Sequence, residues 1–594
     1  MRSMAYESLL FMQHQSMPAL HQHAIPGKAT WDGNTTKMTK IECCRIKNHK
    51  TMTKSLRILA IIAAVCCYAQ WIDARVYYVK TDGTGNGDSW QEAAGDLDEM
   101  MEKASSGDEI WIAKGVYKPT RLIKASKKNS RAFVLKDGVS LYGGFAGNES
   151  SIAQREKGWQ AYSFTNETVL SGDDDVEDVW TRTFMNATDY LYGWEVENNM
   201  IPGTENNSNH ILYSSSTLEH PTTINGITLK GGNACVWNVK AAGGAVYASG
   251  NVRIESCKVM ENSAYFTAES AAPHTLGGAV YLNGSDGAAI TDCLFARNYS
   301  HSSYGAGVGG AVYAKGTNIE RCTFEECVAL DNGGAVYNDG GTLKDCTFTN
   351  CYAAAGGAVY NDGNIDNCKA YGCKALKGGA IYNLGTVRNT IVANCKADTR
   401  QYGDDNGGKG GGIYNQSGGV DNVAAFNNLS YQGGGIFVEN GKLANVTALN
   451  NEAIDTAHEP NVAFGETASE AGNTENSIFS KDTEMSNFNN PTTFTGMASN
   501  DDQLNIIMQA DWNVAYRAPL AGQGYSENTA SGIRHRPTIA TDNSQAWNLN
   551  GQKAGRSHRG IAIRGGKKNN NDEIATHKHI SRCSKLIAIK LCAM

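Results

Sequence analysis

Proline is scarce in this sequence, with 10 residues in 594, although glycine is abundant, with 65. A chain rich in glycine but poor in proline is neither collagen nor a flexible linker, and it suggests many tight turns between short strands. A strong charge is also missing, because the formal net charge is only -7. The composition therefore gives no basic footprint for a nucleic-acid partner.

Long apolar segments are rare, and the one at residues 52–74 has the pattern of a secretory signal peptide. Lys54 and Arg57 precede an uncharged run from Ile58 to Ala69, and small residues follow. A buried strand or helix is the alternative. The run is shorter than the roughly 20 residues that span a bilayer, so we expect no transmembrane span in the mature chain. The sequence thus predicts a secreted or cell-surface protein, with residues 1–51 a gene-model extension or disordered.

The central part of the chain consists of repeats that begin with two glycines. The motif GGAVY or a close variant starts at Gly243, Gly277, Gly309, Gly333, Gly356, Gly378, Gly410 and Gly433. The steps between these glycines are 34, 32, 24, 23, 22, 32 and 23 residues. A repeat of about this length indicates a solenoid.

Two further columns of residues keep a fixed offset of five within every repeat. The first column is Cys257, Cys293, Cys322, Cys346, Cys368, Thr390, Val423 and Val446. The second is Asn262, Asn298, Cys327, Cys351, Cys373, Cys395, Asn428 and Asn451. Leucine is too sparse for a leucine-rich repeat. We therefore predict an all-β fold, a right-handed parallel β-helix of the pectate-lyase-like solenoid kind, with a short N-terminal cap helix within residues 90–104.

The Gly-Gly-Ala-Val stretch, followed by Phe295 and Asn298 in a Phe-x-x-Asn pattern, resembles the repeats of the chlamydial polymorphic outer-membrane proteins. The entry segments at 76–80, 87–90, 107–117, 141–145 and 170–173 are similar to those of right-handed β-helix surface proteins of Bacteroidetes. The resemblance covers about residues 75–530 and implies a β-helix at the cell surface. It implies no particular activity, because solenoids host varied functions.

These patterns divide the chain into seven parts. After the extension (1–51) and the signal peptide (52–74) we expect a cap with entry coils (75–160), β-helix repeats (161–470) and irregular terminal coils (471–540). Residues 541–568 resemble the C-terminal sorting tails of exported Bacteroidetes proteins, although a small hairpin is the alternative. Residues 569–594 do not continue the pattern and are either disordered or an aberrant tail.

Ten of the 16 cysteines lie between Cys235 and Cys395. Equivalent cysteines in stacked coils should lie about 5 Å apart, within reach of a disulfide. They could equally form a reduced core ladder, because a thiol is small and apolar. Metal binding is the third alternative, although no histidine converges on either column.

Two sets of residues are candidates for ligand binding. The first is the aromatic row Tyr247, Tyr281, Tyr313, Tyr337, Tyr360, Tyr382, Tyr414 and Phe437, which alternates with a Val/Ile row. If Val and Ile point inward, the aromatic rings line the outside and are available to sugar rings. If the aromatic residues point inward instead, they belong to the core. The second set lies in the insertions 263–276, 299–308 and 396–409, which should project from one edge. It comprises Tyr265, His274, His301, Tyr304, Arg400, Tyr402, Asp404 and Asp405.

No catalytic constellation emerges from the sequence. Charge just past the repeated strand is limited to Lys315, Asp339, Asp362 and Glu439. Asp339 and Asp362 should stack, but Asn-Asp-Gly is first of all a turn sequence. Asp173, Asp174 and Asp175 are weak calcium candidates, and no cofactor is otherwise expected. We predict a non-catalytic protein for adhesion, or for binding a polysaccharide or a host or bacterial surface ligand. The alternative is a carbohydrate-active enzyme, a polysaccharide lyase or glycosidase.

Overall fold

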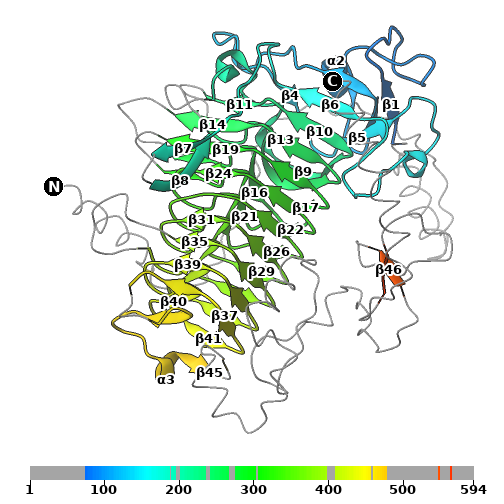
Figure 1. The fold of residues 1–594 in the computed structure, drawn as a ribbon. Coiled ribbons are helices and arrows are strands. Elements are labelled where there is room, and N and C mark those ends of the chain that lie inside the picture. The colour runs from blue at the N-terminus through cyan, green and yellow to red at the C-terminus, as the bar shows by residue number, and fades with distance from the viewer. Residues whose placement is uncertain are drawn as a thin grey trace, which may run out of the picture. The chain divides into compact units, whose positions relative to one another are not determined.

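The computed structural model describes residues 74–186, 189–194, 201–235, 241–266, 274–302, 306–397, 408–455, 459–475, 477, 546–548 and 562–564. Most of these residues form a right-handed parallel β-helix, as predicted, in which successive strands stack in register (Figure 1). Each coil runs along three sides, and each side forms a sheet that continues from coil to coil.

The largest sheet has 22 strands, and most repeats contribute two short strands to it. They are β1 (Val76–Val79), β2 (Glu109–Ala113), β4 (Phe133–Val134), β5 (Ser140–Phe145), β9 (Leu212–Asn225), β12 (Val246–Glu255), β16 (Val280–Gly284), β17 (Ala289–Thr291), β21 (Val312–Lys315), β22 (Asn318–Glu320), β25 (Val336–Asp339), β26 (Thr342–Lys344), β28 (Val359–Asn361), β29 (Asn364–Asp366), β32 (Ile381–Asn383), β33 (Thr386–Arg388), β36 (Ile413–Asn415), β37 (Gly419–Asp421), β40 (Ile436–Val438), β41 (Lys442–Ala444), β44 (Val462–Phe464) and β45 (Thr474–Glu475).

The second side is a sheet of 11 parallel strands. They are β3 (Gly115–Tyr117), β6 (Thr168–Ser171), β10 (Ile227–Lys230), β13 (Lys258–Met260), β18 (Leu294–Ala296), β23 (Thr323–Glu325), β27 (Thr347–Thr349), β30 (Lys369–Tyr371), β34 (Ile391–Ala393), β38 (Ala424–Phe426) and β42 (Thr447–Leu449).

The third side is built from shorter strands in parallel groups. They are β11 (Asn233–Ala234), β14 (Ser263–Phe266), β19 (Tyr299–Ser302) and β24 (Val328–Ala329), then β31 (Lys374–Ala375), β35 (Lys396–Ala397), β39 (Leu429–Ser430) and β43 (Glu452–Ala453), with β15 (Thr275–Leu276) beside β20 (Gly307–Val308). Bridges from Val328 to Tyr352 and from Tyr352 to Lys374 join the two longer groups.

Two antiparallel hairpins depart from the coil. One is β7 (Arg182–Asn186) with β8 (Asp189–Trp194), inside the segment expected to hold only repeats. The other is β46 (Ala546–Asn548) with β47 (Ala562–Arg564), within the segment 541–568, where a hairpin was one of the two alternatives.

Three left-handed corners turn the chain in each of the eight repeats. The first glycine of every Gly-Gly pair has a positive φ, and so does the residue before each of the two inward columns. At Gly333 only glycine fits, because an added Cβ would lie 2.2 Å from the carbonyl oxygen of Val336. At the other corners asparagine predominates in the later repeats, for example Asn389 and Asn394, because asparagine tolerates this conformation better than most residues. The corners fix which residue turns inward next.

The core is a set of vertical columns inside the coil. Val246 and its equivalents are buried, as are the residues of the two inward columns. Phe295, Phe324 and Phe348 stack with ring centroids 4.9 Å apart. Burial of such rings is the main favourable term in this fold.

A third inward column consists of asparagines that the sequence analysis did not single out. Asn338, Asn361, Asn383 and Asn415 are fully buried. The side-chain amides of Asn338, Asn361 and Asn383 each donate to the Oδ1 atom of the next asparagine at 2.8 Å, and that of Asn415 donates to the Gly418 carbonyl. The column therefore satisfies its polar groups internally, as buried amides require.

The cysteine columns also lie inside the coil. The ten cysteines among the described residues are all free, and nine of them are buried in the two columns. Burial raises the pKa of the Cys327, Cys351 and Cys373 thiols well above the usual range. In the described structure the thiols pack as small apolar groups with weak hydrogen bonds to backbone carbonyls.

A short cap helix covers the first coils, as predicted. It is α2 (Leu97–Lys103), which is shorter than the 90–104 segment because Asp96 caps its start by accepting a hydrogen bond from the Glu99 N–H. Its apolar residues Leu97, Met100 and Met101 are buried. The other helical elements are η1 (Ile152–Gln154), η2 (Thr204–Asn206) and α3 (Glu470–Asn473). Within the described residues no helix is long and apolar enough to cross a membrane.

Candidate functional site: the outer face of the 22-stranded sheet

The aromatic row lies on the outer face of the 22-stranded sheet. In each coil the Val or Ile residue is buried inside, and the next residue points outward because side chains alternate along a strand. The row follows consecutive strands in register, Tyr247 to Tyr281 to Tyr313 and onward. Tyr213 of β9 extends it by one coil toward the N-terminus. We call this row the tyrosine ladder; it comprises Tyr213, Tyr247, Tyr281, Tyr313, Tyr337, Tyr360, Tyr382, Tyr414 and Phe437.

The rings of the tyrosine ladder stack on one another. Neighbouring centroids are 4.8 to 5.7 Å apart, and most neighbouring planes lie within 20° of parallel, the pair Tyr382–Tyr414 at 31° being an exception. Each ring face is therefore covered by the next ring. Most of the tyrosines remain half-buried, whereas Tyr414 and Phe437 are buried. What the ladder presents to a ligand is a line of ring edges and hydroxyls, and not the open ring faces on which a sugar would stack.

Several hydroxyls of the ladder lean toward the following coil. The Tyr313 hydroxyl donates to Asp339 Oδ2 at 2.9 Å, and the Tyr382 hydroxyl to Gln416 Oε1 at 2.7 Å. Tyr414 donates in the same way to Glu439 Oε2 at 2.6 Å. In each case the acceptor stands two residues after the aromatic residue of the next coil. A second column, polar except at Leu384, thus runs beside the tyrosines.

This second column contains the four charged residues noted in the sequence. Lys315 Nζ lies 3.7 Å from Asp339 Oδ2, in the neighbouring strand. Asp362 follows one coil later, and its pKa is raised by burial and further by the nearby Asp339 carboxylate. The ladder is therefore flanked by a local group of one ammonium and two carboxylates.

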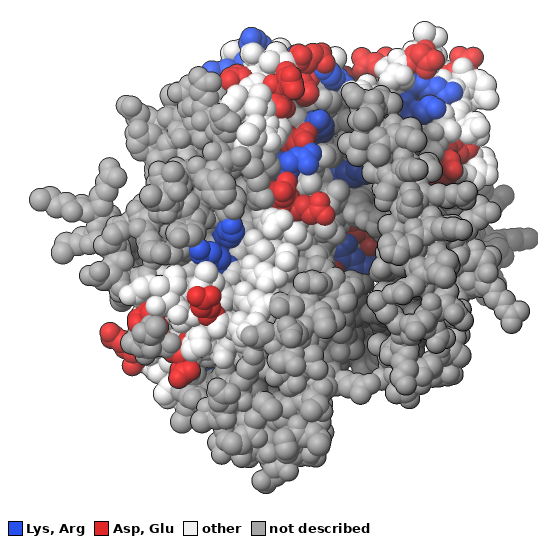
Figure 2. Space-filling model, viewed as in Figure 1, with Lys and Arg blue, Asp and Glu red and all other residues white. Residues whose placement is uncertain are grey.

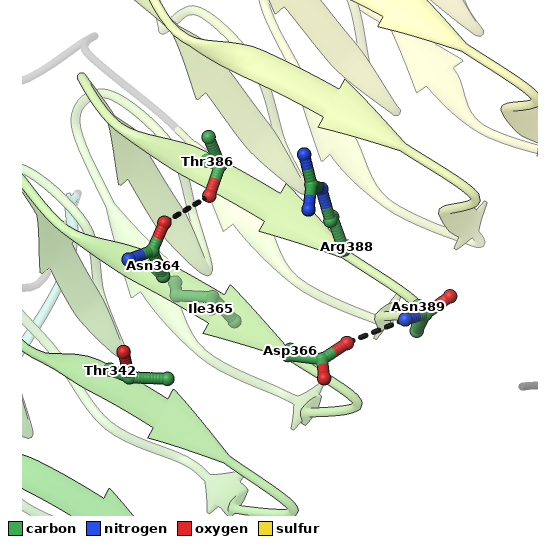
Figure 3. A pocket seen from close by; sticks show the side chains of 7 residues that line it. All are labelled: Thr342, Asn364, Ile365, Asp366, Thr386, Arg388 and Asn389. Atoms are coloured by element: carbon green, nitrogen blue, oxygen red, sulfur yellow. Dashed lines mark hydrogen bonds between the residues drawn. The ribbon is translucent and has the colours of Figure 1, made fainter. Parts of the chain in front are cut away.

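A shallow pocket of about 390 Å³ opens on the same sheet, on the second strand of the fourth to sixth repeats. Figure 3 shows Arg388 projecting from β33 beside Asp366 of β29, its register partner. The Thr386 hydroxyl donates to Asn364 Oδ1 at 2.6 Å, and Asn389 Nδ2 donates to Asp366 Oδ1 at 2.5 Å. The lining residues are Thr342, Asn364, Ile365, Asp366, Thr386, Arg388 and Asn389.

The pocket provides hydroxyl, amide, carboxylate and guanidinium groups within one hollow. These groups suit a ligand with many hydroxyls, because they include both donors and acceptors. Asp366 is the single carboxylate that lines it. The residues that line the pocket therefore do not include the pair of carboxylates that a glycosidase uses for hydrolysis.

The charges on the described surface are mixed. Figure 2 shows Lys and Arg interspersed with Asp and Glu, without a broad field of one sign on the visible described face. Examples are the ion pairs of Arg321 with Asp292 at 2.8 Å and of Lys258 with Glu167 at 2.8 Å.

The insertion residues lie differently from the expectation of projecting loops. Tyr265 and His301 are register partners in β14 and β19, and both are buried because the start of each insertion continues the third-side strand of its coil. Burial lowers the pKa of His301 to about 4. His274 Nδ1 accepts the Ala306 N–H at 3.0 Å. Tyr304, Arg400, Tyr402, Asp404 and Asp405 lie outside the described residues.

The carboxylates of Asp173, Asp174 and Asp175 bind neighbouring groups of the protein itself. Asp173 accepts the backbone N–H of Asp175 at 2.7 Å, and Asp174 accepts that of Val176 at 3.1 Å. Asp175 forms an ion pair with Lys118. Across the described part of the chain, no group of three or more His, Cys, Asp or Glu side chains is arranged to hold a metal ion.

Sequence reasoning missed the pocket, although the signal was present. The second strand of each repeat reads Thr-Leu-Lys, Asn-Ile-Asp and Thr-Val-Arg at 342–344, 364–366 and 386–388. The central apolar residue of each triplet is buried, so the polar residues on either side face outward. Alternation in these triplets could have located the polar face, although not the hollow in it.

No protein-family model matches this sequence, and no curated protein matches it significantly. Among solved structures, a rhamnogalacturonan lyase is similar with 13% identity and a TM-score of 0.34, over 60% of this chain and 82% of that one. The pectate lyase Pel9A is similar with 11% identity and a TM-score of 0.27, over 76% of this chain and 96% of that one. At these values neither likeness bears on activity or substrate.

Proposed function

We propose that this chain is an exported, non-catalytic protein that binds a glycan along the outer face of its 22-stranded sheet. The observation that carries the proposal is the tyrosine ladder, with hydroxyls and a parallel polar column over successive coils. A polysaccharide is itself a linear repeat of hydroxyl-bearing units. A ligand of that kind meets similar groups at most coils, so weak contacts add along the chain.

The pocket supports the same proposal. Its Thr, Asn, Asp and Arg side chains lie on the sheet that carries the ladder, and β25 and β26 of one coil are separated only by a glycine turn. In the first repeat the single strand β12 spans both positions. A glycan crossing the turn would contact ladder hydroxyls with one sugar and pocket side chains with the next.

Export rests on the segment at 52–74 and on the resemblance to β-helix surface proteins of Bacteroidetes and to the chlamydial repeats. A surface location agrees with a role in adhesion to a host or bacterial surface. Fractionation of the producing cells with an antibody to the β-helix tests this part, and retention of the whole protein inside the cell contradicts it.

The binding proposal is tested on a panel of plant, host and bacterial glycans with the full chain and a matched pair of variants. The double variant Tyr337→Phe/Tyr360→Phe removes two ladder hydroxyls and keeps the stack, and we expect weaker retention. Tyr162→Phe, outside the ladder, serves as the control and should leave retention unchanged. Equal binding by all three proteins would exclude the ladder hydroxyls as contacts.

A carbohydrate-active enzyme is the second candidate, because Asp339 and Asp362 are neighbouring carboxylates and the pKa of Asp362 is raised. A raised pKa is a property of a general acid. New reducing ends or unsaturated products, lost in Asp362→Asn, would favour this candidate. Retention of glycan without any product favours binding alone.

A further inference from the structure

Two lysines stand side by side at the C-terminal end of the tyrosine ladder. Lys377 and Lys409 occupy equivalent positions before the Gly-Gly pairs of the sixth and seventh repeats, and their backbones form a parallel bridge. Lys377 Nζ lies 5.3 Å from the ring centroid of Tyr414, and Lys409 Nζ lies 4.5 Å from that of Phe437. The contacts with the rings hold both ammonium groups beside the ladder.

This arrangement places like charges on adjacent strands, which is unfavourable. Neither lysine forms an ion pair with a described residue. Burial and the charge of Lys409 lower the pKa of Lys377, and Glu439 opposes that effect. The Glu439 carboxylate already accepts the Tyr414 hydroxyl at 2.6 Å. The two ammonium groups therefore lie near a carboxylate that already accepts a hydrogen bond, and Asp455 accepts one from Gln432, the residue that follows Lys409 in the next coil.

Lys315, in the middle of the same face, shows the contrasting case. Its ammonium group lies 3.7 Å from Asp339, so a carboxylate of the protein itself balances it. At the position of Lys377 and Lys409 the earlier repeats carry uncharged residues, such as Val308, Asn332 and Ala355. The lysine pair is thus confined to two coils, at the C-terminal end of the face that we have proposed to bind a glycan.

We propose that the acidic group of a glycan, a uronate carboxylate or a sulfate ester, binds between the ammonium groups of Lys377 and Lys409. The sugar that carries this group lies against the half-buried ring of Tyr382, the last ring of the ladder that is not buried. The inference rests on the proposed glycan binding by this face and narrows the ligand to an acidic polysaccharide. A bound anion relieves the repulsion between the lysines and forms charge-assisted hydrogen bonds with both.

The test compares acidic and neutral glycans of the same backbone by calorimetric titration of the full chain. Oligogalacturonate is paired with its methyl ester, and dextran sulfate with dextran, so that the two arms separate a carboxylate from a sulfate. The variants are Lys377→Gln/Lys409→Gln and the charge-conserving Lys377→Arg/Lys409→Arg. Lys258→Gln, on the 11-stranded sheet and outside the proposed binding face, is the control.

We expect tighter binding of the acidic member in at least one pair, weakened by added salt. The double glutamine variant should lose about tenfold in affinity for that member, within the range of two exposed charge contacts. The arginine variant and Lys258→Gln should keep most of it. Circular dichroism verifies that each variant is folded.

The remaining outcomes separate the two proposals. If acidic and neutral members bind equally, or if the glutamine variant binds like the parent protein, the lysine site is wrong while glycan binding by this face stands. If the parent protein binds no glycan of the panel or of the two pairs, both proposals fail.

Discussion

The interior of the β-helix and the outer face of its largest sheet are built from the same strands, but their polar groups are bonded differently. Inside, Asn338, Asn361 and Asn383 satisfy one another within a closed column. Outside, the hydroxyls of the tyrosine ladder reach only to the next coil, at the protein's surface. Stacking in register therefore produces stability in one column and a ligand-accessible line of polar groups in its neighbour.

The largest difference between the two regions should appear when an aromatic ring is removed from each. Phe324 is fully buried between Phe295 and Phe348, so Phe324→Ala should lower the free energy of unfolding by about 3–5 kcal/mol. Tyr337→Ala on the outer ladder should cost clearly less, because its ring is only half-buried. Urea unfolding, monitored by circular dichroism, measures the free energy of unfolding of both variants. Equal losses would remove the distinction between core and surface stacks.

Acid should lower the free energy of unfolding through a histidine at the N-terminal end of the tyrosine ladder. This histidine is buried like a core residue. His210 is buried against Tyr213 and Tyr247, and burial lowers its pKa to about 4. The unfolded chain binds this proton near pH 6.5 and the folded chain only near pH 4, so stability is lost as the pH falls between these values.

The loss from this one group should reach about 2–3 kcal/mol near pH 4. The measurement is urea unfolding at several pH values, compared with His210→Gln, which does not titrate. We expect a shallower pH dependence in the variant. The same slope in both proteins would show that another group is responsible.

Breaking the inner asparagine column should have an intermediate effect. Asn361→Leu removes the partner of both Asn338 and Asn383 and leaves buried polar atoms unpaired, which should cost about 1–3 kcal/mol. Tyr360→Phe, at the adjacent outward position, is the matched control and should change stability by less than about 0.5 kcal/mol. Thermal unfolding of the pair shows whether inner and outer hydrogen bonds differ as we expect.

The smallest expected effect is a gain in stability at one of the left-handed corners of the coil. Asn394 has φ of 52°, and its replacement by glycine removes the steric cost of that conformation. Asn394→Gly should stabilise the fold by up to about 1 kcal/mol, and Asn394→Ala should destabilise it by a similar amount. A shift of the same sign for both variants in urea unfolding would contradict the role of the left-handed corner.

Much of this fold could be predicted from sequence because each repeat keeps the spacing of its inward residues. The Gly-Gly pairs and the column from Cys257 to Cys368 predict the coil, and alternation places Val246 and Tyr247 on opposite faces. Which of the two points inward stayed open until the structure showed Val246 to be buried. The ring stacking could not be predicted, because side-chain angles depend on the neighbouring coil. The strand at Tyr265 and the hollow at Arg388 were also missed, since both depend on contacts between residues far apart along the chain.

The bridges from Asn332 to Ala355 and from Ala355 to Lys377 have a consequence for how the gene can change. A coil here takes 22 residues, from Gly356 to Lys377, and begins and ends at equivalent points. Loss or duplication of such a unit joins one corner of a coil to the equivalent corner of another coil. Every column of stacked residues then becomes shorter or longer by one residue. Lengthening or shortening by whole units therefore preserves the architecture, while the number of tyrosines offered to a ligand changes in single steps.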